Sequence, residues 1–452
     1  MPDWIEYVGG ILIVVVVLAA SIALHEVGHM VPAKRFGVKV TQYMIGFGPT
    51  IFSWRRGETE YGFKWIPAGG YIRMIGMFPP RPGEDEHHLR DSSTGAFQTL
   101  ADDARHASAQ EVQPGDEDRV FYKLSVPKKV VVMLGGPTMN LLIGVALLTV
   151  LLVGFGDPRN PVLTTTIQEV QVCMADASDV DAPCDPDGDE GLPKTPAFAA
   201  GLRPGDEVLT YGGTPIDSWE QVRGLIRESV DTPTEVVVLR AGEEERLTVT
   251  PVPNEVAELD DSGEVVLDED GEARTVQAGF LGLVPVQTTE PTSVAAVPGF
   301  VGDTIAQTAR LVIALPVRMV DVAQAAFGTE ERDPTGPIGI VGVGRLTGEI
   351  ASLDDIETRD KVSTIIGILG QVNLALFVFN LLPLLPLDGG HVAGALWEGL
   401  RRQLARLRRR PDPGPVDVAK ALPLVYVVSV VLIAMSLMLL YADIVRPITL
   451  RG

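Results

Sequence analysis

The stretch GGILIVVVVLAASIALHEVGHMV, residues 9–31, decides the fold of this chain. Residues 9–24 carry no charge, and the continuation to Val31 brings the stretch to the roughly 20 residues that a helix needs to cross a bilayer. The pattern therefore predicts a transmembrane helix with His25, Glu26 and His29 near its end. A signal peptide would begin with positive charge, whereas residues 1–7 (MPDWIEY) are acidic, so we interpret the helix as a retained span.

Three further apolar runs are long enough to span a membrane: residues 130–155, 365–387 and 421–441. Apolar residues make up 46% of the chain and are bunched in these runs rather than spread evenly. The predicted fold class is a polytopic α-helical membrane protein with about four transmembrane helices.

Basic residues beside the runs predict the topology, because lysine and arginine concentrate on the cytoplasmic side of membrane proteins. Basic clusters follow the first run, precede the second and separate the third from the fourth; they are Lys34, Arg35 and Lys39, then Lys123, Lys128 and Lys129, then Arg401, Arg402, Arg406 and Arg408 to Arg410. A four-span arrangement places all three clusters on one side. Both termini and the segment from about 156 to 364 then lie outside the cytoplasm.

The formal net charge of −22 is a poor match to nucleic acid, which binds basic surfaces. The excess acid favours solubility of the exposed segments instead. The chain has two cysteines, Cys173 and Cys184, both in the predicted external segment. That compartment is oxidising in most cells, so a disulfide closing a short loop is one interpretation and two unpaired thiols are the other.

The motif His25-Glu26-Val27-Gly28-His29 is HExxH. Residues four apart lie on one helix face, so both imidazoles can reach one metal ion, and the glutamate between them can take a proton from a metal-bound water. Ionisable side chains inside a membrane cost free energy unless they are paired or bound to metal. The sequence therefore predicts a zinc site rather than a polar helix end without metal.

A catalytic zinc needs a third protein ligand and an open position for water. The third apolar run ends in NLLPLLPLDGGH, residues 380–391, and in the four-span topology this end lies at the same depth as HExxH. We expect Asp388 to be the third ligand, with His391 as the alternative.

Outside the spans, the sequence predicts β structure in two places. Residues 38–77 read as short strands punctuated by glycine turns, and residues 197–252 as a small β-rich unit. In the second, Ser218 is the expected cap of a helix. Residues 78–118 are rich in Pro, Asp and Glu and are expected to be a flexible cytoplasmic insertion. Residues 294–327 predict amphipathic surface helices rather than a fifth span.

Three motifs in combination resemble the site-2 protease family of intramembrane zinc metalloproteases, of the bacterial regulator-of-sigma-E protease type. They are HEVGH in the first span, LDGGH at residues 387–391 and GLRPGD at residues 201–206, and the resemblance covers about residues 11–395. Residues 121–140 resemble the second-span signature of the family, in which Gly136, Pro137 and Asn140 fall in place. A second GLRPGD unit, which some bacterial relatives carry, is absent from the sequence.

The resemblance implies the roles of the site residues. His25, His29 and Asp388 match the zinc ligands, and Glu26 matches the general base. Asn380 matches an asparagine used in substrate handling, and PAGGYIRM, with Gly69 and Gly70, resembles a membrane-dipping β-loop that contacts substrate. GLRPGD is similar to the degenerate PDZ module of these proteases.

The resemblance and the apolar runs together predict a linear order of segments. It runs from a first transmembrane helix with HExxH (1–35) through a membrane-associated β-loop (36–77), a flexible cytoplasmic insertion (78–126), a second transmembrane helix (127–156), an extracytoplasmic PDZ-like domain (157–290), amphipathic surface helices and a connector (291–361), a third transmembrane helix with LDGGH (362–400) and a basic cytoplasmic loop (401–420) to a fourth transmembrane helix and external C-terminus (421–452).

The implied activity is hydrolysis of peptide bonds in the membrane segments of single-span proteins of a bacterial inner membrane, with Zn²⁺ as cofactor. Substrates similar to anti-sigma factors, and remnant signal peptides, are the expected classes. An upstream site-1 protease would make the first, external cut, and the PDZ-like domain would exclude untrimmed substrates by size. The alternative is a PDZ-bearing membrane scaffold or chaperone with a structural metal, in which Glu26 would be dispensable.

Overall fold

The computed structural model describes residues 4–80, 105, 108, 110–174, 184, 192–257, 265–266, 274–328, 332–333, 336–353 and 356–448. The chain divides into two compact units. The membrane unit comprises residues 1–155 and 292–452, and the β-rich unit comprises residues 156–291.

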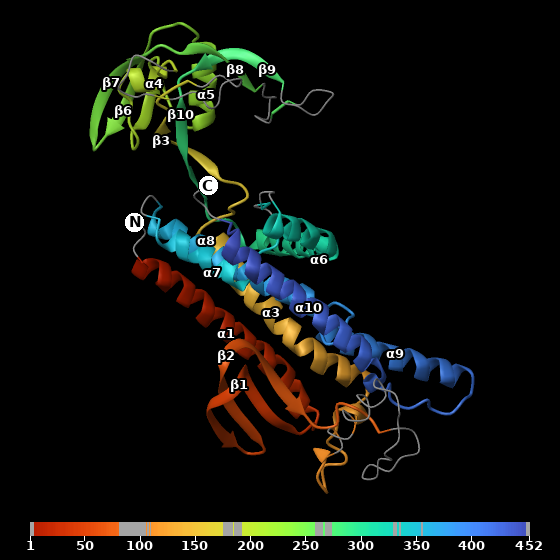
Figure 1. Cartoon of the computed structure of the whole chain (residues 1–452). Helices are drawn as coiled ribbons and strands as arrows, with labels where there is room; N and C mark the ends of the chain where they lie inside the picture. Colours follow the sequence, from red (N-terminus) through yellow and green to blue (C-terminus); the bar gives the residue numbers. More distant parts are fainter. Residues whose placement is uncertain are drawn as a thin grey trace. The chain divides into compact units, whose positions relative to one another are not determined.

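Four helices of the membrane unit are long and apolar enough to cross a bilayer, which confirms the predicted number of spans among the described residues. They are α1 (Trp4–Arg35), α3 (Val126–Gly154), α8 (Thr358–Asn380) and α10 (Leu422–Val445). The helices α6 (Val297–Phe327) and α7 (Ile340–Ala351) complete this part of the unit, and neither qualifies as a span. The axes of the four spans are tilted in a similar way in Figure 1, and α1 and α8 both pack against α3.

Helix α3 is the centre of the membrane unit, because it packs against both α1 and α8. Glycines allow the close approach. A Cβ on Gly28 of α1 would lie 2.3 Å from the carbonyl oxygen of Gly135 on α3, and a Cβ on Gly144 of α3 would lie 2.7 Å from the Leu374 side chain on α8. Small residues at helix contacts are the usual way in which membrane helices pack tightly. Here they bring the α3 backbone against the HExxH turn.

The segment after α1 is one long hairpin rather than the predicted series of short strands. Strands β1 (Val40–Arg56) and β2 (Thr59–Met74) pair antiparallel, but β1 residues 42–45 pair with both halves of β2. Four strand segments therefore lie in the order 70–74, 40–45, 59–63 and 50–56. The chain bends where Gly46 and Gly48 adopt positive φ (93° and 86°), which glycine tolerates and other residues rarely adopt.

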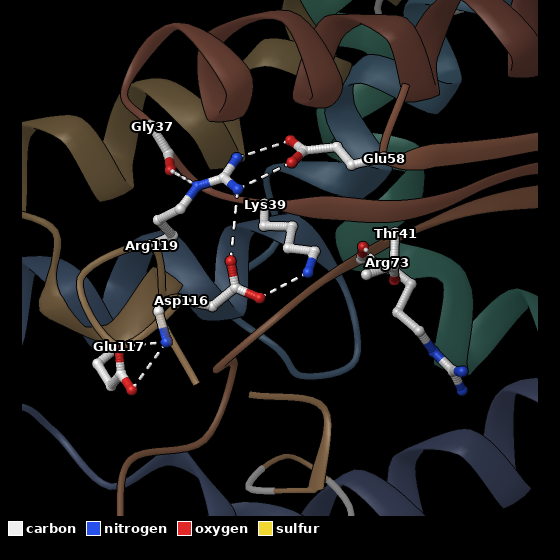
Figure 2. Close-up of polar contacts among 9 residues, drawn as sticks. Gly37, Lys39, Thr41, Glu58, Arg73, Asp116, Glu117 and Arg119 are labelled. Carbon is white, nitrogen blue, oxygen red and sulfur yellow. Dashed lines mark hydrogen bonds and ion pairs between the residues drawn. The ribbon is translucent and has the colours of Figure 1, made fainter. Parts of the chain in front are cut away.

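Ionic contacts tie the start of this hairpin and its turn to residues 116–119, which lie within the predicted insertion 78–126 (Figure 2). Arg119 makes a two-pronged contact with Glu58, at 2.7 and 2.8 Å, and Lys39 donates to Asp116 at 2.5 Å. The Arg119 guanidinium holds the pKa of the Glu58 carboxyl below its ordinary value. The contact therefore persists at any pH above that of ordinary carboxyl titration. Most of the predicted flexible insertion, residues 81–104, lies outside the described residues.

The segment predicted as the third span, residues 362–400, contains two helices. Helix α8 ends at Asn380, a turn occupies residues 381–387, and Asp388 is the first residue of a new helix, α9 (Asp388–Leu407). Pro383 and Pro386 cannot continue the helix. Gly389 lets α9 fold back closely, since a Cβ there would lie 2.3 Å from the carbonyl oxygen of Leu382. The predicted basic loop 401–420 is consequently helical as far as Leu407.

A buried ion pair fastens α9 to α3. The Lys129 ammonium on α3 donates to the Glu398 carboxylate on α9 at 2.8 Å, and the two side chains are only 6% and 2% exposed. Glu398 also accepts from the backbone amide of Val416 at 3.1 Å and pairs with Arg402 at 3.1 Å. Because Glu398 lies ten positions after Asp388 on one helix, this cluster helps to set where α9 begins.

The β-rich unit contains a sheet with strand order β10-β3-β4-β6-β7, to which β5 (Thr214–Pro215) is added beside β4. The strands are β3 (Val162–Val170), β4 (Glu207–Tyr211), β6 (Thr234–Arg240), β7 (Glu243–Val249) and β10 (Leu283–Thr288). Strands β8 (Val252–Ala257) and β9 (Thr275–Phe280) form a separate pair. The predicted strand from 245 to 252 ends earlier, at Val249.

Helices α4 (Pro196–Ala199) and α5 (Trp219–Glu228) complete the unit. Ser218 caps α5 as predicted, with its side chain accepting from the Gln221 amide. The GLRPGD turn is held by Asp206, which is buried and accepts from the Arg203 amide and the Arg240 guanidinium. Cys173 and Cys184 are joined in a disulfide.

Removing one member of the Lys129–Glu398 pair should destabilise the membrane unit strongly. Glu398→Met leaves a buried ammonium without its main partner, which costs about 3–5 kcal/mol of unfolding free energy. The double variant Lys129→Met, Glu398→Met should lose less than this single variant, because no unpaired charge remains. Unfolding in mixed micelles measures both, and Asp118→Asn, in the exposed Lys123–Asp118 pair, is the control expected to match the wild type. A double variant less stable than the single would contradict the interpretation.

Candidate metal centre

The HExxH motif lies on α1, four residues before its final turn, where its two histidines share one helix face. The Nε2 atoms of His25 and His29 are 3.2 Å apart, and His29 is buried. One turn of helix thus presents two nitrogen donors toward one point.

Asp388, the first residue of α9, completes the donor set. Its Oδ2 atom lies 3.3 Å from Nε2 of His25 and 3.3 Å from Nε2 of His29. Oδ2 is buried and has no hydrogen-bond donor among the described residues. The three residues are a group whose donor atoms could hold one metal ion.

The dimensions of this triangle fit zinc. Tetrahedral zinc with bonds of about 2.0–2.1 Å to nitrogen and oxygen has ligand atoms separated by about 3.3–3.4 Å. The observed separations are 3.2 and 3.3 Å. Charge also fits, because Asp388 and the adjacent Glu26 bring two carboxylates into an apolar helix bundle, and a divalent cation balances them.

One face of α3 supports the histidines from behind. Val132, Gly136 and Asn140 are spaced four residues apart, so they form a stripe along the helix. The Nδ1–H of His29 donates to the Val132 carbonyl at 2.8 Å. This bond places the His29 proton on Nδ1 and leaves Nε2 free for a metal.

Gly136 leaves the space that the imidazoles occupy. A Cβ at this position would lie 2.2 Å from Nε2 of His29 and 2.6 Å from Nε2 of His25. Both distances are shorter than 3.0 Å, the limit below which a Cβ atom essentially never contacts another heavy atom. A side chain here would displace the donor nitrogens, so the motif on α1 depends on a residue of α3.

Asn140 orients the ring of His25, as the Val132 carbonyl orients the ring of His29. Its amide group lies 3.1 Å from Nδ1 of His25, and the side chain is buried. With Nδ2 toward the ring, Oδ1 is left buried without a hydrogen bond in the described part of the chain. Turning the amide over occupies the same space and lets Oδ1 accept the Nδ1–H of His25, the arrangement that a metal on Nε2 requires.

An open cavity of about 310 Å³ adjoins the donor triangle. Glu26, Asn380 and Gly70 line it together with His25, His29 and Asp388. His391, the alternative ligand, lines the cavity but is outside the donor group. Gly69 is absent from the lining, and its α-carbon faces Phe47 instead.

Strand β2 passes directly beside the motif. Gly70, Tyr71 and Ile72 line the cavity, and a Cβ on Gly70 would lie 3.1 Å from Cγ of Glu26. The hydroxyl of Tyr43 on β1 donates to the Ala23 carbonyl of α1 at 2.8 Å, which anchors the hairpin there. Gly70, Tyr71 and Ile72 belong to the strand segment 70–74, which is at the edge of the bent hairpin. The cavity therefore has a β-strand edge along one wall.

The sequence pattern singled out the three donors but not the residues that orient them. Gly136 and Asn140 were identified only as positions of a family signature, with no role predicted for them. A linear sequence does not show which helix faces the histidines. Their four-residue spacing with Val132 was the available signal. The cavity also includes Met133, which had no predicted role, and Met74 and Met77 from the predicted β-loop.

Comparison with known proteins gives consistent matches along the chain. A model of peptidase family M50 matches residues 13–411. The chain is 32% identical over 450 residues to the zinc metalloprotease Rip1 of Mycobacterium tuberculosis H37Rv, covering 98% of this chain and 99% of that protein. It is 30% identical to Rip1 of Mycolicibacterium smegmatis, with 98% of each chain covered. It is 26% identical to the zinc metalloprotease RasP of Geobacillus kaustophilus, covering 88% of this chain and 91% of that one.

Substitutions of Asn140 should separate hydrogen bonding from packing. Asn140→Leu keeps the shape but removes the acceptor for His25, so zinc affinity should fall about 10- to 100-fold. Asn140→Asp keeps an acceptor oxygen and should stay within a few-fold of the wild type. Competition with a chelator of known affinity measures both.

The control for this series is Thr149→Val on the same helix. Its hydroxyl donates to the Val145 carbonyl of α3 itself, at 2.7 Å. Zinc affinity should not change in this variant. If the leucine variant bound zinc as tightly as the aspartate variant, Asn140 would be a packing residue only.

Proposed function

Because this chain belongs to peptidase family M50 and is a zinc metalloprotease of the site-2 type, we propose that His25, His29 and Asp388 hold its zinc and that Glu26 is its general base. The observation that carries this assignment is the triangle of donor atoms, 3.2 and 3.3 Å apart, with an adjoining cavity. Three protein ligands leave a fourth position for water, as in catalytic zinc sites. A scaffold with a structural metal would be expected to use four.

The chemistry divides between the ion and the side chains. Bound zinc lowers the pKa of its water and polarises the scissile carbonyl. Glu26 is next to His25 in the chain and lines the cavity, so its carboxylate is placed to take the proton of the attacking water. The same carboxyl group then returns a proton to the leaving amine. Asn380, the last residue of α8, also lines the cavity. Its side-chain amide can donate a hydrogen bond to the oxygen of the scissile carbonyl.

Substrate binding by strand addition follows from the shape of the hairpin. Residues 70–74 form the outermost of the four strand segments, and four of them line the cavity. An extended peptide can pair with the free edge of such a strand. A helical membrane segment must first unwind, because its backbone amides are otherwise bonded within the helix. Gly70 at this edge leaves room for the substrate backbone beside Glu26.

The proposed substrates are single-span membrane proteins, similar to anti-sigma factors, and remnant signal peptides. In this scheme a site-1 protease trims the external part of the substrate before this chain cuts the membrane segment. The β-rich unit, with its GLRPGD turn, is the proposed PDZ-like domain and excludes untrimmed substrates by size. The proposed location is a bacterial inner membrane. The basic clusters support an orientation with external termini and with the metal centre near the cytoplasmic side.

Glu26→Gln tests the assignment of the base. The amide cannot accept the water proton, so cleavage of a single-span model substrate in liposomes should fall by about 10²–10⁴-fold. Zinc content should remain that of the wild type, because Glu26 is outside the donor group. His29→Ala is the control that should lose both zinc and cleavage. Wild-type cleavage by the glutamine variant would overturn the proposal.

The strand-addition model makes a separate prediction about substrates. Placing a Gly-Pro pair in the middle of the substrate's membrane segment weakens its helix by roughly 3 kcal/mol and should raise the cleavage rate at least several-fold. Moving the same pair outside the membrane segment is the matched control and should leave the rate unchanged. Equal rates for the uninterrupted and interrupted segments would rule out unwinding as a limiting step.

A further inference from the structure

Helix α9 has a second surface that the metal centre does not use. Gly389 and Gly390 are buried in its first turn, and beyond that turn the buried residues are Ala395 and Glu398. Beyond the first turn, large apolar residues recur on the side of the helix away from Ala395 and Glu398, and all are exposed: Leu396, Trp397, Leu400, Leu404 and Leu407. Trp397 is 56% exposed and Leu407 is 76% exposed. We call these five residues the apolar stripe of α9.

Four arginines stand at the end of this stripe. Arg406 lies in the last turn of α9, and Arg408, Arg409 and Arg410 follow it directly. The turn is ordered, since the Arg408 amide donates to the Leu404 carbonyl at 3.0 Å and the Arg410 amide donates to the Ala405 carbonyl at 2.8 Å. All four side chains are exposed, and none forms an ion pair with an acidic residue that the structure describes.

The neighbouring arginines behave differently. Arg402 pairs with Glu398 at 3.1 Å and with Asp412 at 3.4 Å, and Arg401 contacts the Pro413 carbonyl. In a chain with a net charge of −22, acidic partners are plentiful, yet this group of four has none in the described parts. Four exposed guanidinium groups beside an apolar stripe therefore call for an anionic partner that also accepts apolar side chains.

Helix α9 is too polar to be a span, and it leaves the bundle at an angle to α3 (Figure 1). A helix with a tryptophan and leucines on one side and arginines beside them is suited to the boundary between headgroups and acyl chains. Its N-terminal end is buried among the spans, so the membrane is the surface that the helix meets on leaving them. Anionic phospholipids match both the charge and the apolar character of this surface.

We propose that α9 lies in the membrane interface and that Arg406, Arg408, Arg409 and Arg410 bind anionic phospholipid headgroups. The apolar stripe enters the acyl boundary while the guanidinium groups bond to phosphate oxygens, which arginine contacts with two donors at once. The lipid-bound helix begins at Asp388 and is fastened at Glu398 to α3. Bound lipid thereby stabilises the position of α9, the helix that supplies Asp388 to the donor triangle.

Trp397 reports on this contact, because it lies in the apolar stripe. The protein is reconstituted in vesicles of phosphatidylcholine and phosphatidylglycerol at a fixed 3:1 ratio, with brominated acyl chains on one lipid or the other. The Trp397 signal is the difference in fluorescence between the wild type and Trp397→Phe. Bromine on phosphatidylglycerol should quench this signal about fivefold more per mole than bromine on phosphatidylcholine, the enrichment expected from about one arginine–lipid contact.

Two triple variants test whether the arginines cause the preference. Arg408→Gln, Arg409→Gln and Arg410→Gln together remove three of the four arginines and should reduce the quenching ratio to less than half of its wild-type value. Arg203→Gln, Arg223→Gln and Arg246→Gln, in the β-rich unit, change the net charge equally and should leave the ratio unchanged. Equal quenching by the two lipids in the wild type, a ratio that survives in the first triple variant, or no quenching by either lipid would overturn the proposal. None of these outcomes depends on proteolysis, so they are separate from the test of Glu26.

Discussion

The constraint on which the rest of this structure depends is the cost of placing two imidazoles and two carboxylates within an apolar helix bundle. His25, His29 and Asp388 meet that constraint by converging to 3.2 and 3.3 Å, the spacing that one divalent ion can bridge. Convergence requires α1 and α9, which carry the donors, to meet at one point beside α3. Gly28 and Gly135 allow α1 and α3 to touch, and the turn at residues 381–387 brings in α9.

The orientation of the donors is as important as their identity. An imidazole that binds metal through Nε2 needs an acceptor for its Nδ1 proton. Helix α3 supplies one acceptor for each ring, at Val132 and at Asn140, and leaves the space between them empty at Gly136. The metal centre therefore consists of a donor triangle and a supporting helix. The Lys129–Glu398 pair also joins α3 to α9. Helix α3 therefore contacts both helices that contribute donors, α1 and α9.

Substrate access and membrane contact are arranged around this centre by elements that supply no donor. The bent hairpin brings the edge of β2 to Glu26, and its Tyr43 hydroxyl holds it to α1. Arg119 and Lys39 hold the other end of the hairpin by ionic contacts, at a distance from the chemistry. Helix α9 carries the candidate ligand Asp388 at one end and, at the other, four arginines with no ion-pair partner among the described residues. In the proposed arrangement, one helix connects the chemistry with the surrounding bilayer.

The sequence by itself determined the four spans, the donor residues and the local elements of the β-rich unit, such as the strand at Glu207–Tyr211 and the cap at Ser218. These follow from hydrophobic length, from helical spacing and from short-range hydrogen bonds, which act between residues close in the chain. Only the tertiary structure decided that LDGGH begins a helix instead of ending one, that the hairpin folds across itself, and that Asn140 faces His25. Those features depend on contacts between residues far apart in the chain, such as His25 and Asn140, which are 115 positions apart. No local pattern encodes them, because the free energy of such contacts exists only once the helices have packed.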